Sequence, residues 1–458
     1  MIKKVFLLLT LSILLGIMGL YEKFSPNQAL IFLIFLLSIL GTLFFWDFRL
    51  CLVFIGTGLL FLISGVHISQ LIKFASLDVI IFLIGMMIVV AVLKESDVFQ
   101  WLAALLLRNK QLTGRRLFVT IMFLSAALSG LTGEATSIIV MMAIILEVSE
   151  TLKIKPTPLV ISSVLTTNIG SASTLLGNPI GILIALRGSL TFEDFLIFAL
   201  PVSVLILLIT ILILCLMYKG YLNEISSKIS AELKAASLTK HISLDNKKLI
   251  NIVIFGVLIL SLGLHRRLEI LLGLAENGLL VVLPIIFAAV ALIFRCEKVE
   301  YCIAHEVEWR SLLFFMFLFI EAGILQASGV ADLLAEKAVN NLGNNQRTLT
   351  AAVLFSSGVL SAVLDNTVVV ASYIPVVKNL HVFSSTSDTL WWSLLFGACF
   401  GGNITAIGST ANIIALGLLE KEKNIKVNFL EWLKVGFVIA VISMAVAYFA
   451  LTLPHFQT

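Results

Sequence analysis

The chain has 458 residues, of which 60% are hydrophobic and only 13% are charged. Soluble domains carry about a quarter charged residues, so this composition excludes a soluble enzyme or binding domain and indicates a polytopic membrane protein. The net charge of +4 is small and spread over the predicted loops, which argues against nucleic-acid binding. The five cysteines form no CxxC pair and no metal-ligand spacing, so we expect no transition-metal site.

Apolar stretches of about 20 residues, the length that crosses a bilayer, recur along the chain. The first follows a basic head, as in a signal peptide, but lacks a small-residue cleavage site and is predicted to remain as a helix. Two amphipathic stretches, 98–108 and 330–342, are predicted to lie at the membrane interface, where Trp391 and Trp392 would act as anchors. The predicted spans are residues 3–21, 27–45, 50–65, 77–93, 195–217, 249–264, 277–294, 311–327 and 429–453.

The distribution of Lys and Arg predicts the orientation in the membrane. Lys3 and Lys4 place the N-terminus in the cytoplasm, and counting spans places the basic loop 94–116 on the same side. The lysine-rich segment 219–248 is predicted to be a solvated cytoplasmic linker. We therefore expect an integral, multi-pass protein of the cytoplasmic (inner) membrane, in contact with lipid.

The two halves of the chain share three sequence blocks in the same order. One constant offset in residue number aligns LKESDVFQWLA (93–103) with LQASGVADLLA (325–335), and SGLTGEAT (129–136) with SAVLDNTV (361–368). An offset smaller by one aligns GSASTLLGN (170–178) with GGNITAIGS (401–409). The first copy of the loop between blocks is much richer in Lys and Arg than the second, which predicts that the second copy is inserted upside down. Inverted repeats with interrupted helices are typical of secondary transporters.

Each half contains two apolar segments that are too long and too interrupted for one simple crossing. We predict re-entrant helical hairpins at 116–149 and 348–381, each followed by a broken helix at 158–187 and 388–419. The chain then divides into N-terminal transmembrane helices that belong to a scaffold (1–76), a first repeat (77–218), the linker (219–248) and a second repeat (249–458).

Asp365 stands alone among apolar residues in the second predicted hairpin. A charge at mid-bilayer costs at least about 2.5–3.5 kcal/mol, so it persists where it faces water, an ion or a partner. We place Asp365, Asn366 and Thr367 at the hairpin tip, where free backbone N–H groups attract an anion and carbonyls with a carboxylate attract Na⁺ or H⁺. The alternative is a lone acid that is neutralised near an interface. Glu134 is the corresponding acid of the first hairpin.

The broken helices carry Gly, Ser, Thr and Asn inside hydrophobic sequence. Glycine lets the chain unwind, and the polar side chains supply neutral ligands. Packing of small residues between helices would explain the Gly and Ser residues but hardly the asparagines. The candidate ion and substrate ligands are Glu134, Asn168, Gly170, Ser171, Thr174, Gly177 and Asn178 in the first half and Asp365, Asn366, Thr367, Gly402, Asn403, Thr405 and Asn412 in the second, with Na⁺ expected near Glu134 and Asp365.

Glu321 is a further acid within a predicted span, 311–327. Two interpretations remain open from the sequence. The side chain is either a proton carrier inside the membrane or a residue near the end of its helix.

Two stretches resemble signatures of the ion transporter superfamily. SAVLDNTVVVASYIPVV (361–377) and LWWSLLFGACFGGNITAIGSTANIIALGLLE (390–420) are similar to the second-half signature of the branch that includes the bacterial arsenite carrier, the NhaD-type sodium–proton antiporters and the melanosomal P protein. VLTTNIGSASTLLGNPIGILI (164–184) is similar to the first-half signature, and the resemblance extends from about residue 77 to 450. It departs from the pattern at Gly133-Glu134, where the family carries Asp-Asn, and at GNPIG (177–181), where it carries GDPPN.

The resemblance implies an all-α, citrate-transporter-like fold with about eleven transmembrane helices and two re-entrant hairpins. It also implies a homodimer, elevator-type alternating access, and ion and substrate sites at the hairpin tips and helix breaks. We therefore expect a secondary active transporter, coupled to Na⁺ or H⁺, for a small inorganic or organic anion or oxyanion such as arsenite, with no other cofactor.

Three other functions are weighed against this one. A Na⁺/H⁺ antiporter and a passive channel fit the same residues. An intramembrane aspartyl protease requires two carboxylates that share a proton, usually with a GxGD motif, and Asp365 has no such context. We therefore do not expect an enzyme.

Overall fold

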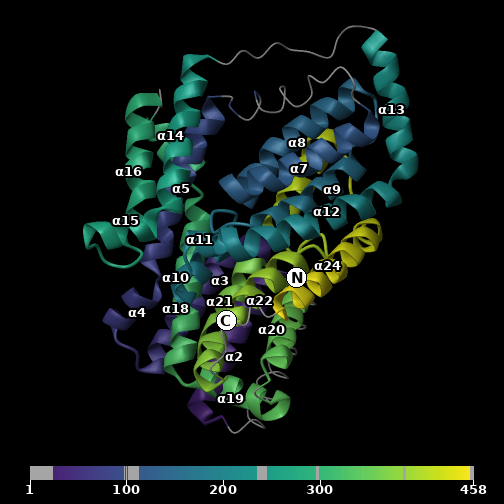
Figure 1. The fold of residues 1–458 in the computed structure, drawn as a ribbon. Coiled ribbons are helices and arrows are strands. Elements are labelled where there is room, and N and C mark those ends of the chain that lie inside the picture. The colour runs from purple at the N-terminus through teal and green to yellow at the C-terminus, as the bar shows by residue number, and fades with distance from the viewer. Residues whose placement is uncertain are drawn as a thin grey trace.

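The computed structural model describes residues 24–96, 98, 101, 113–234, 245–295, 299–343, 345–384 and 388–453. All regular elements within these ranges are helical, which confirms the predicted all-α class (Figure 1). The predicted span 3–21 and most of the amphipathic stretch 98–108 lie outside these residues.

Within the described ranges, seven helical segments are long and apolar enough to cross a membrane. They are α2 (Pro26–Phe44), η1 with α3 (Trp46–Phe48 and Arg49–Ser64), α5 (Leu77–Glu95), α7 (Gly114–Thr132), α11 with η2 and α12 (Phe192–Asp194, Phe195–Ala199 and Leu200–Met217), α18 (Trp309–Ala327) and α24 (Phe429–Leu451). An eighth is formed if α14 (Asn246–Gly263) and α15 (His265–Leu272), which meet at a bend of 66°, count as one span.

Every predicted span that falls on described residues coincides with a helix to within a few residues. The span predicted at 277–294 corresponds to α16 (Gly278–Arg295), an apolar helix that is shorter than the seven membrane-spanning segments named above. The amphipathic stretch 330–342 is α19 (Val330–Leu342). The total of about eleven spans stays a prediction. The short elements that complete the fold are α4 (Ile68–Phe74), α17 (Val299–Tyr301) and η3 (Cys302–Glu306).

Helices of the two halves begin at a constant spacing. α5, α7, α8 (Glu134–Thr151) and α9 (Thr157–Ser171) correspond in order to α18, α20 (Gln346–Ser361), α21 (Asn366–Ser384) and α22 (Thr389–Gly401), and the offset between first residues is the same for all four pairs. For α10 (Pro179–Gly188) and α23 (Thr410–Lys423) the offset is smaller by one. These offsets equal those of the three sequence blocks. Each half is thus built from the same succession: one long helix, a pair of helices joined by a short turn, and a helix broken into two arms.

The turns and breaks occur where the residue types favour them. Gly133 alone separates α7 from α8, and its φ of 90° is a conformation that a residue with a side chain rarely adopts. α10 begins at Pro179 after the N-cap Asn178, whose Oδ1 accepts the Gly181 N–H at 2.8 Å. α23 begins after the N-cap Ser409, whose Oγ accepts the Ala411 N–H at 3.1 Å. The broken helices are therefore interrupted at 172–178 and 402–409.

Helices of one half pack directly on helices of the other around these breaks. α23 of the second half lies against α8 and α9, and α10 of the first half lies against α21 and α22. The two interrupted segments therefore lie close together in the core although they belong to opposite halves of the sequence.

The segment 219–248 differs from the predicted linker. Its first part is α13 (Lys219–Lys234), which stands along one edge of the molecule and packs on α7 (Figure 1). Leu222, Ile225 and Ile229 are buried, and their spacing of three and four residues forms one apolar helix face. The predicted solvated linker is therefore wrong for this part, because the lysines of α13 occupy only part of the helix circumference.

Trp391 and Trp392 are not interface anchors. Each is only 3% exposed, and both lie in α22 within the core. The Trp392 ring packs edge-on against Phe195 at 4.9 Å between centroids, and the Trp391 ring covers Gly188 at the end of α10. Their position follows from the packing of α22 inside the molecule, which the composition of that helix alone does not determine.

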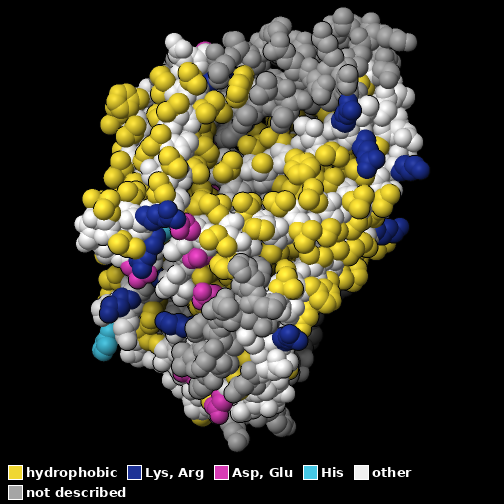
Figure 2. Space-filling view, in the orientation of Figure 1, with side chains coloured by type: hydrophobic (Ala, Val, Ile, Leu, Met, Phe, Trp, Pro, Cys, Tyr) yellow, Lys and Arg dark blue, Asp and Glu magenta, His cyan; other side chains and the backbone are white. Residues whose placement is uncertain are grey.

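The outside of the molecule is extensively apolar. Figure 2 shows hydrophobic side chains over most of the described part of one face, with charged side chains in small separate groups. Exposed Leu, Ile, Val and Phe side chains follow α3, α12, α14 and α16. Such a continuous apolar surface is typical of a protein surrounded by lipid rather than by water.

Candidate functional site

The turn between α7 and α8 places Glu134 against the first helix break. The Glu134 N–H donates to the Gly177 carbonyl at 2.9 Å, which joins the first residue of α8 to residues 172–178. The side chain is 7% exposed, and Oε2 of its carboxyl has no hydrogen-bond partner among the described residues. Glu134 therefore offers one carboxyl oxygen that is enclosed yet unsatisfied.

The corresponding turn of the second half, residues 362–365, is organised by Asp365. Its Oδ1 accepts the Thr367 N–H at 2.9 Å and thus caps the first turn of α21, while its Oδ2 accepts the Thr410 hydroxyl at 2.8 Å. Because Thr410 is the first residue of α23, the acid connects the turn to the second helix break. Asn366 adds a parallel link, since in the amide orientation that satisfies its neighbours its Nδ2 donates to the Gly408 carbonyl at 2.9 Å.

The same hydrogen bonds recur in both breaks. The Thr174 hydroxyl donates to the Gly130 carbonyl of α7, and the Thr405 hydroxyl donates to the Ala362 carbonyl beside α20. Each threonine oxygen also accepts an N–H two residues later, from Leu176 at 3.1 Å and from Ile407 at 3.3 Å. Both breaks therefore have the same backbone path, held by one threonine each.

A network of amides joins the two halves. Asn168 Nδ2 donates to Asn403 Oδ1 at 2.8 Å and to Asn412 Oδ1 at 2.9 Å, while Asn168 Oδ1 accepts the Ser409 hydroxyl at 3.0 Å. All four side chains are fully buried. The sequence predicted these asparagines as ligands within their own halves, and the structure places them in direct contact with one another.

The hydrogen-bonding capacity of this network is largely used within the protein. Asn412 Nδ2 donates to the carbonyls of Gly402 and Thr405, both at 2.8 Å, and Asn403 Nδ2 donates to the Leu165 carbonyl at 3.3 Å. These amides therefore hold the unwound backbone in place and leave little capacity for a further ligand. Among the described residues, the Glu134 carboxyl and the Thr167 hydroxyl keep buried oxygens without a partner.

Asn178 completes the first-half side of the cluster. Its Nδ2 donates to the Ser171 hydroxyl at 2.9 Å and lies 3.1 Å from the Cys399 thiol of α22. Ser171 in turn donates to the Asn168 carbonyl at 2.9 Å. Gly170 directly precedes Ser171, and its lack of a Cβ lets α9 approach the backbone of α7 at Ala126.

The two acids interact with each other and with groups of the neighbouring helices. Asp365 and Glu308 both act electrostatically on Glu134, and Asp365 also acts electrostatically on Arg49. Arg49 is the first residue of α3, and its guanidinium lies 4.3 Å from the centre of the Trp46 ring. Sequence reasoning missed Arg49 because it lies in neither repeated motif, although a basic residue at the start of a span was a visible signal.

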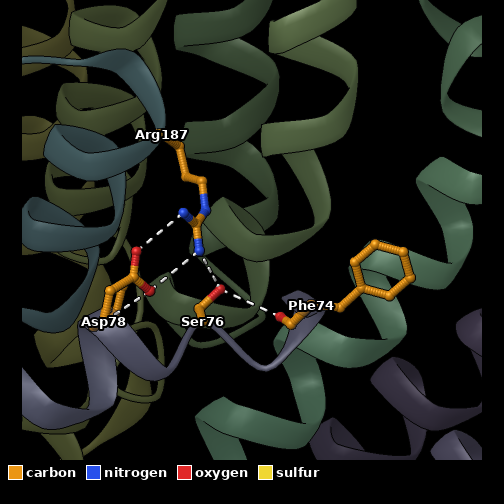
Figure 3. Close-up of polar contacts among 5 residues, drawn as sticks. Phe74, Ser76, Asp78 and Arg187 are labelled. Carbon is orange, nitrogen blue, oxygen red and sulfur yellow. Dashed lines mark hydrogen bonds and ion pairs between the residues drawn. The ribbon is translucent and has the colours of Figure 1, made fainter. Parts of the chain in front are cut away.

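A second polar contact ties a broken-helix arm to a long helix at the edge of this site. Arg187, in the last turn of α10, extends to Asp78 and Ser76 at the start of α5 (Figure 3). Its two guanidinium nitrogens lie 3.2 and 3.4 Å from the Asp78 carboxyl oxygens, and one donates to the Ser76 hydroxyl at 2.6 Å. The bidentate contact holds the C-terminal end of α10, the end opposite to the N-cap Asn178.

Comparison with known proteins decides the family. The citrate transporter family model matches residues 35–397 and 316–455, which together cover most of the chain. The chain belongs to the citrate transporter family. This confirms the resemblance to the ion transporter superfamily, and the chain is accordingly an integral, multi-pass membrane transporter. Membership of a transporter family also implies that it is not an enzyme.

Three relatives illustrate the range of similarity. An uncharacterized transporter of Mycobacterium tuberculosis is 31% identical over 384 residues, covering 83% of this chain and 86% of the relative. A 46 kDa membrane protein of Mycobacterium leprae is 29% identical, covering 81% and 84%. The P protein of Homo sapiens is 26% identical over 462 residues, covering 86% of this chain but 55% of that longer protein.

Proposed function

We propose that this member of the citrate transporter family is a secondary active transporter in which Na⁺ or H⁺ drives the movement of a small anion, either a carboxylate or an inorganic oxyanion such as arsenite. One observation carries the proposal. The starts of four helices, α8, α10, α21 and α23, meet around the amide network that joins the two halves, with the Glu134 and Asp365 carboxyls beside it.

The converging helix starts support an anion as substrate. A helix N-terminus carries partial positive charge and backbone N–H groups that point along the axis, which suits carboxylate and oxyanion oxygens. The amide network holds the helix starts together without adding charge. An anion bound there would therefore be recognised by oriented dipoles and by a bound cation.

The two acids support cation coupling. Among the described residues, one enclosed carboxyl oxygen of Glu134 has no hydrogen-bond partner and each oxygen of Asp365 accepts a single hydrogen bond, so lone pairs remain. Neither acid forms an ion pair among the described residues, and a buried carboxylate without a directly paired cation is costly, which favours binding of Na⁺ or H⁺ at each position. A Na⁺/H⁺ antiporter, in which these acids bind the transported ions themselves, is the second candidate, because the unsatisfied oxygen of Glu134 suits that function equally.

The proposed mechanism is elevator-type alternating access. In it the helix pairs α7–α8 and α20–α21 are re-entrant hairpins of two inverted repeats, and they move with the broken helices across a scaffold formed in part by the first helices of the chain. A homodimer in the cytoplasmic membrane, with a cytoplasmic N-terminus, completes the proposal. The recurrence of helix starts and of the threonine bonds at the two offsets of the sequence blocks supports the repeats.

The test is uptake into proteoliposomes, using a panel of citrate, arsenite, chloride and Na⁺ with imposed Na⁺ and pH gradients. Asp365→Asn keeps the shape of the side chain and removes its charge, so we expect normal insertion but loss of gradient-driven flux. Glu336→Gln, which neutralises an exposed acid of α19, is the matched control and should transport normally. Wild-type flux in Asp365→Asn would refute the role of the acid, and flux down a concentration gradient that no ion gradient can drive uphill would indicate a channel.

A further inference from the structure

Glu321 forms a second buried acidic site, away from the helix breaks. It lies in the middle of α18 and is fully buried. Ser38 of α2 and Thr57 of α3 are also buried, with exposed fractions of 4% and 6%. The Ser38 hydroxyl donates to Glu321 Oε1 at 2.9 Å, and the Thr57 hydroxyl lies 3.5 Å from the same oxygen. The position inside the span excludes the alternative of a residue at the helix end.

The two carboxyl oxygens of Glu321 have different surroundings. Oε1 receives both hydroxyl contacts, whereas Oε2 is buried and has no hydrogen-bond partner among the described residues. A carboxylic acid with its proton on Oε2 has this arrangement, because its carbonyl oxygen accepts hydrogen bonds and its other oxygen needs no donor.

The packing around the carboxyl leaves room for a proton rather than a metal cation. Gly56 of α3 faces the group so closely that a Cβ there would lie 2.7 Å from Ser38 Oγ and closer still to Glu321 Oε1. A metal cation would need several oxygen ligands arranged around it. Beyond the carboxyl itself, the described residues supply two hydroxyls on one side.

No nearby charge compensates the acid. Of the helices that pack on α18, α2 carries no charged residue, and within the described part of the chain no Lys, Arg or His side chain forms an ion pair with Glu321. The charged or titratable residues of those helices and of α18 itself are Arg49 and Cys51 on α3, Lys73 on α4, Asp78, Lys94 and Glu95 on α5, Arg310 on α18, Asp332, Glu336 and Lys337 on α19, and Tyr373, Lys378 and His381 on α21.

The repeat shows that packing does not require an acid here. α5 corresponds to α18 in the first half, and its residue at the position of Glu321 is Val89, which is 2% exposed. A valine thus fills the equivalent place in a buried helix. Packing alone therefore does not account for an acid at this position of α18.

We propose that Glu321, with the hydroxyls of Ser38 and Thr57, forms a proton-binding site between α2, α3 and α18. It is separate from the site at the helix breaks, and it takes up and releases its proton as solvent gains access to these helices. The proposal concerns proton binding itself and does not depend on the identity of the transported ion.

Infrared difference spectroscopy of the purified full-length protein over a range of pH tests the proposal. We expect a carbonyl stretching band of a protonated carboxyl that declines as the pH is raised, shifts in D₂O and is absent from Glu321→Gln. Glu134→Gln, which removes a different buried acid, should retain the band. If Glu321→Gln loses no titrating, D₂O-sensitive component of the wild-type spectrum, the proposal is overturned.

Two further variants keep the test decisive if Glu321→Gln does not fold. Ser38→Ala removes the hydroxyl that donates at 2.9 Å and Thr57→Val removes the more distant one. Ser38→Ala should move the band to higher wavenumber, since a carbonyl that loses a hydrogen bond stretches at higher frequency. Thr57→Val should shift it less, because the Thr57 hydroxyl lies closer to the Phe317 carbonyl (3.3 Å) than to Glu321. An unchanged band in both variants would show that the band does not come from Glu321. Loss of the band on adding Na⁺ at constant pH would overturn a site that takes a proton rather than a metal cation.

Discussion

Alanine at Gly170 or Gly401 should loosen the contact that positions each helix break. Gly170 is in the last turn of α9 and faces the backbone of Ala126 in α7, and Gly401 ends α22 and faces the backbone of Gly358 in α20. A Cβ on either glycine would lie 2.6 Å from the facing carbonyl carbon and closer to other backbone atoms. Real Cβ contacts under 3.0 Å essentially never occur, so the helices must move apart.

The magnitude follows from two opposing effects. Overpacking a dense core costs about 1–3 kcal/mol, and the cost here is difficult to relieve because the obstructing atoms are backbone. Replacing glycine by alanine within a helix returns roughly 0.5–1 kcal/mol. We expect a net loss of about 1–2 kcal/mol for each variant, equal in size for the two because their surroundings are equivalent.

Gly417→Ala is the matched control. Gly417 lies in the interior of α23, and a Cβ there would meet nothing within 4 Å, so alanine should be neutral or stabilising. The assay is the fraction of monodisperse protein that remains after heating in detergent, measured by fluorescence-detected size exclusion. If Gly170→Ala and Gly401→Ala are as heat-resistant as Gly417→Ala, the close approach of these helices is not as described. Destabilisation of only one would contradict the equivalence of the two contacts.

Two predictions concern contacts and orientation, and both use a background that lacks the native cysteines, because Cys51 is exposed. Lys423 of α23 forms an ion pair with Glu150 of α8 across the two halves, so a cysteine pair at these positions should cross-link with a short reagent. Either cysteine alone should give no link, and absence of a link in the pair would contradict the packing of α23 on α8. The inverted repeats predict that a cysteine at Ser227 in α13 labels from the cytoplasmic side and one at Arg347 in α20 from the outside, as measured with an impermeant maleimide on whole cells and on inverted vesicles. Labelling of both positions from one side would refute the inverted arrangement.

Sequence patterns located the helix pairs and breaks because those features depend on local chemistry. Gly133 and Pro179 disfavour a continuous helix at their positions, and Asn178 and Ser409 cap the start of the next helix. The repeat added the register, since the three blocks recur in the same order at nearly the same offset. The amphipathic face of α13 was also present in the sequence, as apolar residues at 222, 225 and 229, but its high lysine content suggested a solvated linker.

The partners of the site residues were decided by tertiary structure. Asn168 bonds to Asn403 and Asn412, and neither of these is the residue that corresponds to it in the repeat. Such pairs arise only when α9 and the second helix break pack together, so no motif within one half predicts them. The same holds for Glu321, because the hydroxyls of Ser38 and Thr57 reach it from two other helices.

The sequence by itself determined the membrane class, the family, the repeated succession of helices and the positions at which they break. These follow from the number of apolar residues in each stretch and from residues that act on their own backbone. Tertiary structure decided which polar groups are satisfied by other polar groups and which remain available. Asn168, Asn403 and Asn412 use their capacity on one another, while Glu134 and Glu321 each keep one enclosed oxygen without a partner among the described residues. The physical reason is that hydrogen bonding of a buried group depends on the atoms that surround it in space, and those atoms come from distant parts of the chain.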